Sequence, residues 1–385
     1  MKKALILYGA TAFGMPEFSP DLRWRTGGYS VPDPIFFAEI DGKKYLLASS
    51  LEIERAAKEA KVDEVVPLEK YISESKEKNL PISVLFLKEH SVTDVTVSHT
   101  VRYGLGKVLG EHFAVEVRPP PFYPERAVKT VLEIAEIEKA QRAVEKAVHE
   151  GILFLRECQI KGNLLFHAEF GDAPIASYHL RKIIDDTLYI LGYIGIESIV
   201  ACGAEAADPH AIRSGLLRPC EPIVMDVFPR SLTTLYFSDQ TRTVFKGEPI
   251  EPMKRMYETV LSAQEGAIAK IKAGVNGHEI HEWVHRHFEH LGYPTNTNRR
   301  PVGGFIHSLG HGVGIDIHEE PQLGGRDSIL EAGHVVTVEP GLYYSIGTET
   351  IPVGGIRIED IGVVADNGFR NLTQFPKKLE EMIIS

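Results

Sequence analysis

Apolar and polar residues follow two different patterns along the first third of the chain. Nearly continuous apolar runs of strand length lie at residues 5–8, 35–40, 44–48 and 82–87. Residues 53–60 instead place their apolar positions at helical spacing. Short strands that alternate with helices predict an α/β domain.

A proline run ends this first pattern. The sequence Arg-Pro-Pro-Pro at residues 118–121 can continue neither a helix nor the interior of a sheet. It therefore predicts a linker, and we expect an N-terminal domain at 1–120 and a second domain at 125–385.

Beyond the linker the pattern becomes helical and then repeats. Residues 131–158 carry a long helical periodicity, which predicts two helices or one bent helix. A further helix is expected from Ser177, a favourable N-cap, to a Leu-Gly-Tyr stop at 191–193. Residues 256–271 and 277–288 repeat this arrangement, and the second of them is followed by the same tripeptide.

Each pair of helices is followed by a histidine-bearing stretch and two strand-like runs. The runs lie at residues 223–227 and 235–245 in the first half, and at 335–339 and 356–364 in the second. Because four elements recur in the same order, we predict a duplicated architecture. Two similar halves that face each other would form a cleft between them.

Both pairs of strand-like runs carry acids inside or beside their apolar positions. The acids are Asp226 and Asp239 in the first half and Glu339 and Glu359 in the second. A carboxylate at such a position is expected to be buried, and burying it without a partner is costly. Only Arg242 and Arg357 lie close by in sequence, too few to neutralise four acids. Two divalent cations would do so.

Histidines supply the nitrogen ligand of such a site. The segment 307–319 holds His307, His311 and His318, and glycines on both sides of His311 allow the backbone to approach closely. His210 precedes the first acid. Taken singly, each of these residues is more often structural than a ligand, but their joint pattern favours a metal site.

The donor set limits the choice of metal. Carboxylates with one imidazole suit manganese, cobalt, zinc or iron. Two such ions ~3.5–4 Å apart can share a hydroxide nucleophile and polarise a carbonyl group.

Composition excludes several other classes of protein. The 385 residues are 43% hydrophobic and 25% charged, as in a soluble globular protein, and the net charge of −11 argues against a nucleic-acid partner. Three sparse cysteines fit a reducing, cytoplasmic compartment. The apolar stretch 4–10 is short for a signal peptide and fits a first strand better. No apolar run reaches the ~18 residues of a membrane span, so no membrane association is expected.

Five ordered motifs resemble those of a known group. They read MDV at 225–227, SDQTRT at 238–243, HSLGHG at 307–312, TVEPGLY at 337–343 and GIRIED at 355–360. Over residues 125–380 the chain resembles the pita-bread metallopeptidases, which include prolidase, aminopeptidase P and methionine aminopeptidase. The resemblance implies an α/β protein with an N-terminal creatinase-like α/β domain and a C-terminal pita-bread α+β domain that contains an internal pseudo-twofold repeat.

The resemblance also assigns metal ligands. They are Asp226, Asp239, His311, Glu339 and Glu359, which would hold two divalent metal ions per chain. Asp226 would serve one ion, His311 and Glu339 would serve the other, and both ions would share Asp239 and Glu359.

Further roles follow in the same way. The expected catalytic residues are His210, His318 and Glu339, and the expected substrate-binding residues are His210, His307 and His318. Glu339 would take a proton from water and pass it to the leaving nitrogen, and His318 would help to stabilise the oxyanion. Thr241 and Arg357 would orient the carboxylates.

A front domain of this size favours prolidase and aminopeptidase P over methionine aminopeptidase. We therefore expect an exopeptidase that cleaves the Xaa-Pro bond of dipeptides or short peptides by a metal-bridging hydroxide, and that forms a homodimer. Two departures leave dipeptidase and aminopeptidase activity both open. Asp226 and Asp239 are thirteen positions apart, two more than is usual in the family, and no arginine follows His318 before Arg326.

Three alternatives stay open from the sequence. The chain could be a catalytically silent pita-bread protein that binds a partner, although its ligand set is complete. It could be a metal-free hydrolase similar to creatinase, although such enzymes lack the four acids. It could also be an aminopeptidase without a preference for proline.

Overall fold

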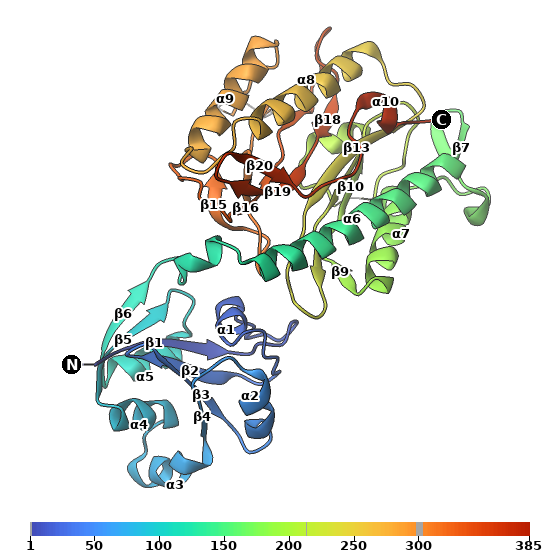
Figure 1. Cartoon of the computed structure of the whole chain (residues 1–385). Coiled ribbons are helices and arrows are strands. Elements are labelled where there is room, and N and C mark those ends of the chain that lie inside the picture. Colours follow the sequence, from blue (N-terminus) through green and yellow to red (C-terminus); the bar gives the residue numbers. More distant parts are fainter. Residues whose placement is uncertain (1, 213, 298–302) are drawn as a thin grey trace. The chain divides into compact units, whose positions relative to one another are not determined.

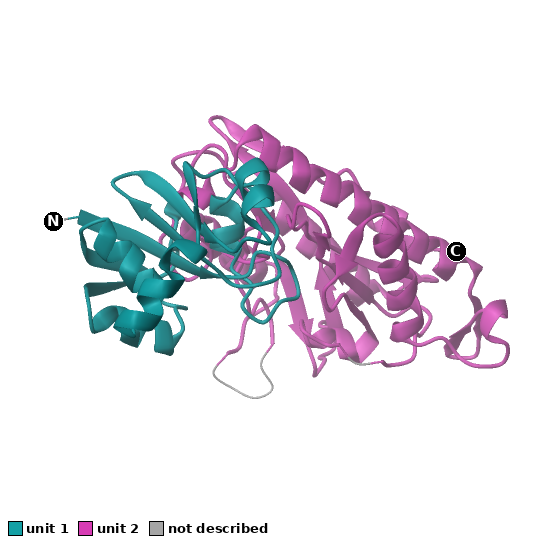
Figure 2. Cartoon of the chain, turned by 90° about the horizontal axis from the view of Figure 1, so that it is seen from below, with its two compact units in different colours: residues 1–124 teal, residues 125–385 magenta. Residues whose placement is uncertain are grey.

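The computed structural model describes residues 2–212, 214–297 and 303–385. The chain divides into two compact units, unit 1 (Met1–Pro124) and unit 2 (Glu125–Ser385) (Figure 2). Among the described residues, no helix is both long enough and apolar enough to cross a bilayer.

Unit 1 is built around a six-stranded mixed sheet with the order β4-β3-β2-β1-β5-β6 (Figure 1). Its strands are β1 (Lys2–Gly9), β2 (Ile35–Ile40), β3 (Lys43–Ala48), β4 (Glu64–Pro67), β5 (Val92–Ser98) and β6 (Ala114–Arg118). Its helices are α1 (Pro20–Arg25), α2 (Ile53–Glu59), α3 (Glu69–Lys78), α4 (Ile82–Glu89) and α5 (Tyr103–Gly110). This is the predicted α/β pattern.

The sheet of unit 1 is buried on both faces. Ile6 and Phe36 belong to one apolar cluster, whereas their neighbours Leu7 and Phe37 belong to another. Successive side chains of a strand point to opposite faces, so a strand that is covered on both sides is apolar at consecutive positions. This burial explains why the strands were recognisable as nearly continuous apolar runs.

The prediction of a strand at residues 82–87 is wrong, because these residues form helix α4. Val84, Leu85, Phe86 and Leu87 are all buried, which makes the sequence continuously apolar. Such a short run reads the same in a buried strand and in a buried helix. The predicted strands at 5–8, 35–40 and 44–48 and the helix at 53–60 are confirmed.

Unit 2 opens with α6 (Val131–Glu157), one uninterrupted helix where the sequence allowed two (Figure 1). Its N-cap, Thr130, forms a capping box with Glu133: the Glu133 amide donates to Thr130 Oγ1, and the Thr130 amide donates to Glu133 Oε2. The next helix is α7 (Ser177–Ile190). Its N-cap is Ala176 and not Ser177 as predicted, because the Ser177 hydroxyl donates to the Gly215 carbonyl instead.

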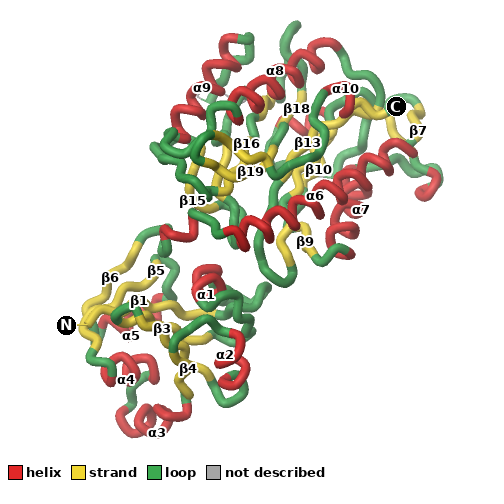
Figure 3. Tube along the Cα trace, in the orientation of Figure 1, coloured by secondary structure: helices red, strands yellow, loops and turns green. Residues whose placement is uncertain are grey.

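The second half of unit 2 repeats this order. Helices α8 (Glu251–Ile268) and α9 (Gly277–His290) pack together as α6 and α7 do (Figures 1 and 3). Side chains from both halves, such as Val144, Met225 and Val336, join in one hydrophobic core.

Two sheets carry the residues of interest. The first has the order β10 (Ile199–Cys202), β11 (Ile223–Val227), β13 (Gln240–Lys246), β21 (Ile383–Ile384). The second has the order β15 (Glu319–Leu323), β14 (Gly310–Gly312), β16 (Val335–Val338), β19 (Asp360–Ala365), β20 (Gly368–Asn371). Shorter pairs are β9 (Tyr193–Gly195) with β12 (Pro229–Ser231), β17 (Gly341–Tyr344) with β18 (Gly354–Arg357), and β7 (Gln159–Lys161) with β8 (Leu164–Phe166). Helix α10 (Leu379–Met382) lies near the C-terminus.

Two of the predicted strands differ in their bounds from the observed ones. The run 235–245 becomes a strand only at Gln240, and the run 356–364 is split between β18 and β19. As a result Asp239 lies just before a strand, Glu339 just after one, and Glu359 in a break between two. Because they lie outside regular strands, these side chains need not alternate between the two faces of a sheet.

Candidate metal centre

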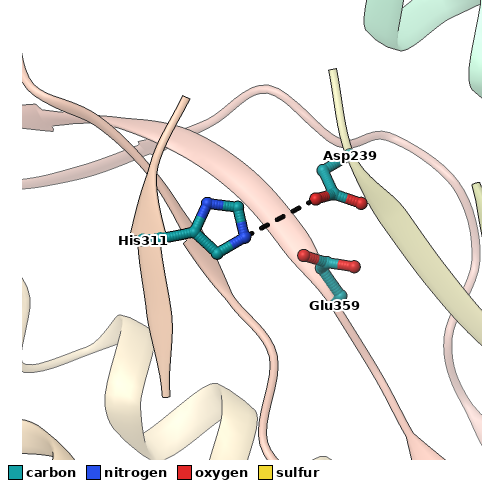
Figure 4. Close-up of side chains that lie close together, drawn as sticks. All are labelled: Asp239, His311 and Glu359. Atoms are coloured by element: carbon teal, nitrogen blue, oxygen red, sulfur yellow. Dashed lines mark ion pairs between the residues drawn. The ribbon is translucent and has the colours of Figure 1, made fainter. Parts of the chain in front are cut away.

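Three buried side chains converge in unit 2 (Figure 4). Asp239, His311 and Glu359 each offer one ligand atom, and these atoms lie within 4.8 Å of one another. Asp239 lies just before β13, His311 in β14, and Glu359 between β18 and β19. Elements of both halves therefore contribute to the cluster, as the repeat predicted.

The orientation of His311 leaves one ring nitrogen for a ligand. Its Nδ1 lies 3.1 Å from the Gly312 carbonyl, so this nitrogen carries the proton and donates it. Its Nε2 lies 3.7 Å from Asp239 Oδ2 and 3.3 Å from Glu339 Oε1. A backbone acceptor that fixes the opposite nitrogen is the usual support of a metal-binding histidine.

The glycines beside His311 are needed for close backbone approach. A Cβ on Gly310 would lie 2.1 Å from the Thr337 carbonyl oxygen, and one on Gly312 would lie 2.3 Å from the Glu320 carbonyl oxygen. Any side chain at either position would push β14 away from its neighbours, and the His311 ring would move with it.

Two carboxylate oxygens in the cluster have no protein partner among the described residues. Asp239 Oδ1 and Glu359 Oε1 are both buried and accept no hydrogen bond. A native protein rarely leaves such atoms unsatisfied, and an ion is one of the standard explanations. The residues present therefore fit a divalent cation.

The same burial raises the pKa of Glu359, Asp239 and Glu339. The pKa of Glu359 lies well above its usual value because of burial and repulsion from Glu339 and Asp226, and Asp239 is shifted in the same direction by burial and Glu359. Burial raises the pKa of Glu339 to about 8. These shifts favour the protonated acids, whereas a bound metal requires the carboxylates, so metal binding and proton release are linked.

Glu339 and Asp226 lie beside the three central residues. Thr337 Oγ1 donates to Glu339 Oε1 at 3.2 Å. Asp226 is held by the protein itself, since Thr241 Oγ1 lies 3.0 Å from its Oδ1 and Arg357 Nη2 lies 2.5 Å from its Oδ2. All five predicted ligands thus lie in one region, with Asp226 the most engaged by protein groups.

Thr241 and Arg357 contact the carboxylates as expected of orienting residues. The Thr241 hydroxyl lies 2.8 Å from Glu359 Oε2 and accepts a hydrogen bond from Arg357 Nε. Arg242, by contrast, does not neutralise any of the four acids. It pairs with buried Asp360, so Arg357 is the one arginine that faces the cluster within the described part of the chain.

The longer connector between Asp226 and Asp239 does not disturb the β11–β13 ladder, where Asp226 lies opposite Thr241. The connector contains β12, which pairs with β9. Arg230 on this strand donates to the carbonyls of Leu235 and Ile315. The connector therefore contacts the loop between β14 and β15.

Two of the predicted histidines, His318 and His307, lie beside the cluster. The His318 ring packs edge-on against His311 with centroids 4.4 Å apart, and burial together with His311 lowers the His318 pKa to about 4. His307 Nε2 lies 2.9 Å from the Tyr343 hydroxyl, and burial followed by Arg357 lowers the His307 pKa to about 3. Both rings are neutral at pH 7.

His210 is placed less directly. It is exposed, and its amide donates to Asp208 Oδ1. It adds a smaller electrostatic contribution to the lowered pKa values of His307 and His318, after burial and nearer charges. Among the described residues, no hydrogen bond or ion pair joins the His210 side chain to the cluster.

Sequence reasoning missed Tyr343. Its hydroxyl lies between His307 Nε2 and Arg357 Nη1, at 2.9 and 2.8 Å, and so links His307 to the arginine that holds Asp226. The residue ends the TVEPGLY motif, but it lies in an apolar strand and is 1% exposed, which is typical of a core residue. Its position in the motif was the only available signal.

The fold and the buried acid–histidine cluster define a metallohydrolase of the duplicated α+β type. Residues 135–366 match the family model of "Metallopeptidase family M24". This chain belongs to that family. The resemblance drawn from the motifs is confirmed, and so is the predicted fold.

Named relatives agree with this membership. The Xaa-Pro dipeptidase of Pyrococcus furiosus is 32% identical over 262 residues, which cover 66% of this chain and 65% of that protein. The matched stretch thus spans less than two thirds of the relative's length. Solved structures cover more of the chain. A prolidase from Pyrococcus furiosus matches with a TM-score of 0.74 and 25% sequence identity, over 97% of this chain and 96% of the prolidase. An X-Pro aminopeptidase from Thermotoga maritima matches with a TM-score of 0.76 and 22% identity, over 98% of this chain and 96% of the aminopeptidase.

Proposed function

We propose that this protein is a metal-dependent exopeptidase that hydrolyses the Xaa-Pro bond of dipeptides or short peptides. The proposal rests mainly on two buried oxygens, Asp239 Oδ1 and Glu359 Oε1, which have no hydrogen-bond partner among the described residues and whose side chains converge with His311. The similar protein of Pyrococcus furiosus, an Xaa-Pro dipeptidase, supports the proposal.

The proposed site holds two divalent ions, of manganese, cobalt, zinc or iron. The proposed ligands are Asp226, Asp239, His311, Glu339 and Glu359. A bound pair of such ions supplies Lewis acidity towards a carbonyl and lowers the pKa of water. Four acids beside a single arginine leave a negative excess that suits this charge.

The remaining chemistry belongs to side chains of this protein. Glu339 would accept the proton of the attacking water and deliver it to the leaving nitrogen. The neutral His318 would donate a hydrogen bond to the oxygen on which negative charge develops. His307 and His210 would bind the substrate, and Tyr343 would keep the His307 ring in place through the contact between its hydroxyl and Nε2.

The position of Arg326 bears on substrate length. It is 66% exposed and forms an ion pair with Glu320. An arginine engaged in this way is a weak candidate for a carboxylate-binding residue in the cleft, so cleavage of longer Xaa-Pro-Yaa peptides is expected alongside that of dipeptides. The cytoplasmic location and the homodimer remain predictions of the sequence.

A substrate panel tests the proposal. The purified protein is stripped of metal, reloaded with manganese, cobalt or zinc, and assayed against Xaa-Pro dipeptides, Xaa-Pro-Yaa peptides and the peptide Met-Ala-Ser. We expect cleavage of the proline-containing peptides only. Cleavage of Met-Ala-Ser alone would replace the proline assignment with a general aminopeptidase, and no cleavage by a metal-loaded protein would favour a silent binding protein.

A further inference from the structure

The loop that presents His318 is tied to a distant part of the chain by buried charges. This loop joins β14 to β15, and Glu319 follows His318 directly. The Glu319 carboxylate lies between Arg126 Nη2 and Lys129 Nζ, the latter at 2.8 Å. Both cations come from the segment that precedes α6, almost two hundred residues earlier in the chain.

These three side chains form a buried group. The exposed fractions of their side chains are 8% for Glu319, 11% for Arg126 and 1% for Lys129. Lys129 Nζ also donates to the carbonyls of Arg126 and Ala127, so its remaining protons are satisfied. Burial alone would raise the pKa of Glu319, but Lys129 and Arg126 outweigh it and the pKa is lowered, so the group is a carboxylate. We call it the Glu319 triad.

The triad determines the shape of the loop as well as its position. Glu319 Oε1 accepts a hydrogen bond from the Asp316 amide at 3.0 Å, which closes the turn that contains His318. A Cβ on Gly314 would lie 2.5 Å from both carboxylate oxygens of Glu319, so only glycine at that position leaves room for the carboxylate. Arg126 also pairs with Asp316, at 2.9 Å, on the other side of the same turn.

The connector between Asp226 and Asp239 also holds the loop that carries His318. The Phe237 amide donates to the Gly314 carbonyl at 2.8 Å, and Arg230 Nη2 donates to the Ile315 carbonyl at 3.1 Å. His318 is the one histidine of this loop, and its ring packs edge-on against His311. A loop held at both flanks has little freedom to turn this ring away from the metal centre.

We propose that Glu319, held between Arg126 and Lys129, is a positioning residue that directs the His318 imidazole at the metal centre. This inference rests on the proposed role of His318 in hydrolysis. It assigns the triad a task in substrate turnover, in addition to joining the start of unit 2 to its second half. A purely structural group would affect folding and would leave the contribution of His318 unchanged.

The first test does not depend on hydrolysis. Carbethoxylation of His318 by diethyl pyrocarbonate is followed by peptide mass spectrometry in the manganese-loaded protein, with exposed His149 on α6 as an internal reference. In Glu319→Gln the rate at His318 relative to His149 is expected to rise, because the ring is no longer held against His311. The control Glu138→Gln, which breaks a surface pair with Arg370, should leave the ratio unchanged. An unchanged ratio in Glu319→Gln would overturn the inference.

A double-mutant cycle on kcat gives the second test. Glu319→Gln is expected to lower kcat by about ten- to hundredfold with manganese content preserved, because small misplacements of a catalytic group cost that much. In a His318→Ala background the same substitution should cost almost nothing more. Additive losses in the double mutant would show that Glu319 acts elsewhere. A wild-type protein that hydrolyses no peptide would refute the proposed function, but the carbethoxylation result would remain valid.

A charge-balanced variant covers the case in which Glu319→Gln does not fold. Removing the acid alone leaves two buried cations, whereas Lys129→Met combined with Glu319→Gln removes one charge of each sign. This double variant should fold, bind manganese and show the same rise in His318 reactivity. If it folds with wild-type reactivity at His318, the positioning role is wrong.

Discussion

Raising the pH should lower the free energy of unfolding of unit 2 in the metal-free protein. Glu339, Asp239 and Glu359 all have raised pKa values in the folded protein. The folded state therefore binds more protons than the unfolded state, and its stability is lost as the pH rises through the folded pKa values. His307 and His318 have lowered pKa values and act in the opposite direction, but only below their ordinary value of 6.5. Above that pH these two histidines no longer offset the acids.

The size of the effect follows from Glu339. Its pKa is raised to about 8. Between pH 6.5 and pH 8 the unfolded state has lost the Glu339 proton and the folded state still holds it. Each pH unit then lowers the free energy of unfolding by about 1.4 kcal/mol, so the rise of about 1.5 units over this window removes about 2 kcal/mol. Its carboxylate is 16% exposed, so solvent screening reduces this value little. Asp239 and Glu359 add losses of the same sign.

Urea unfolding in the presence of a chelator measures this loss. Trp24 lies in α1 of unit 1 and Trp283 in α9 of unit 2, so a Trp24→Phe variant makes tryptophan fluorescence report on unit 2 alone. We expect the urea midpoint to fall between pH 6.5 and pH 8 in the metal-free protein and to be nearly constant with excess manganese. Glu339→Gln should flatten the slope. A metal-free midpoint that is constant or rises over this window would refute the assignment of protonated acids to the cluster.

Three further substitutions test separate parts of the site. Asp239→Asn removes a predicted shared ligand and should lower the bound metal per chain, measured by atomic emission, together with at least about a thousandfold loss of kcat; full metal content would count against its ligand role. Thr241→Val removes a hydroxyl that contacts two carboxylates and should weaken manganese binding by about 10–100-fold in calorimetry; unchanged affinity would argue against that role. Arg242→Met leaves buried Asp360 short of a cation and should cost about 3–5 kcal/mol in urea unfolding, whereas surface Arg370→Met should cost under about 1 kcal/mol; equal costs would contradict the assigned burial.

The sequence predicted most of the fold because its elements are long or strongly patterned. Helices α6, α8 and α9 present one apolar face over many turns, and the duplicated order of helices and strands is visible without coordinates. It failed at α4, where burial on all sides removed the periodicity that separates a helix from a strand. It also missed the break at Glu359, because no residue type in Ile-Arg-Ile-Glu-Asp marks the end of a strand.

The candidate site could be predicted where the charged residues that matter lie near one another in sequence. Four acids in apolar surroundings with few nearby cations indicated a metal, and the structure shows three of the predicted ligands converging with unpartnered oxygens. Partners far apart in sequence were not predictable. Asp360 as the partner of Arg242, and Arg126 with Lys129 as partners of Glu319, depend on tertiary packing that no spacing rule contains.

The central claim is that hydrolysis depends on metal held by this cluster. The most direct measurement titrates manganese into the metal-free protein and records bound metal and the rate of hydrolysis of an Xaa-Pro dipeptide in the same samples. We expect no hydrolysis without metal, a rate that rises with occupancy and saturates, and no such rise in Asp239→Asn. Hydrolysis that persists after exhaustive metal removal, or full occupancy without any hydrolysis, would contradict it.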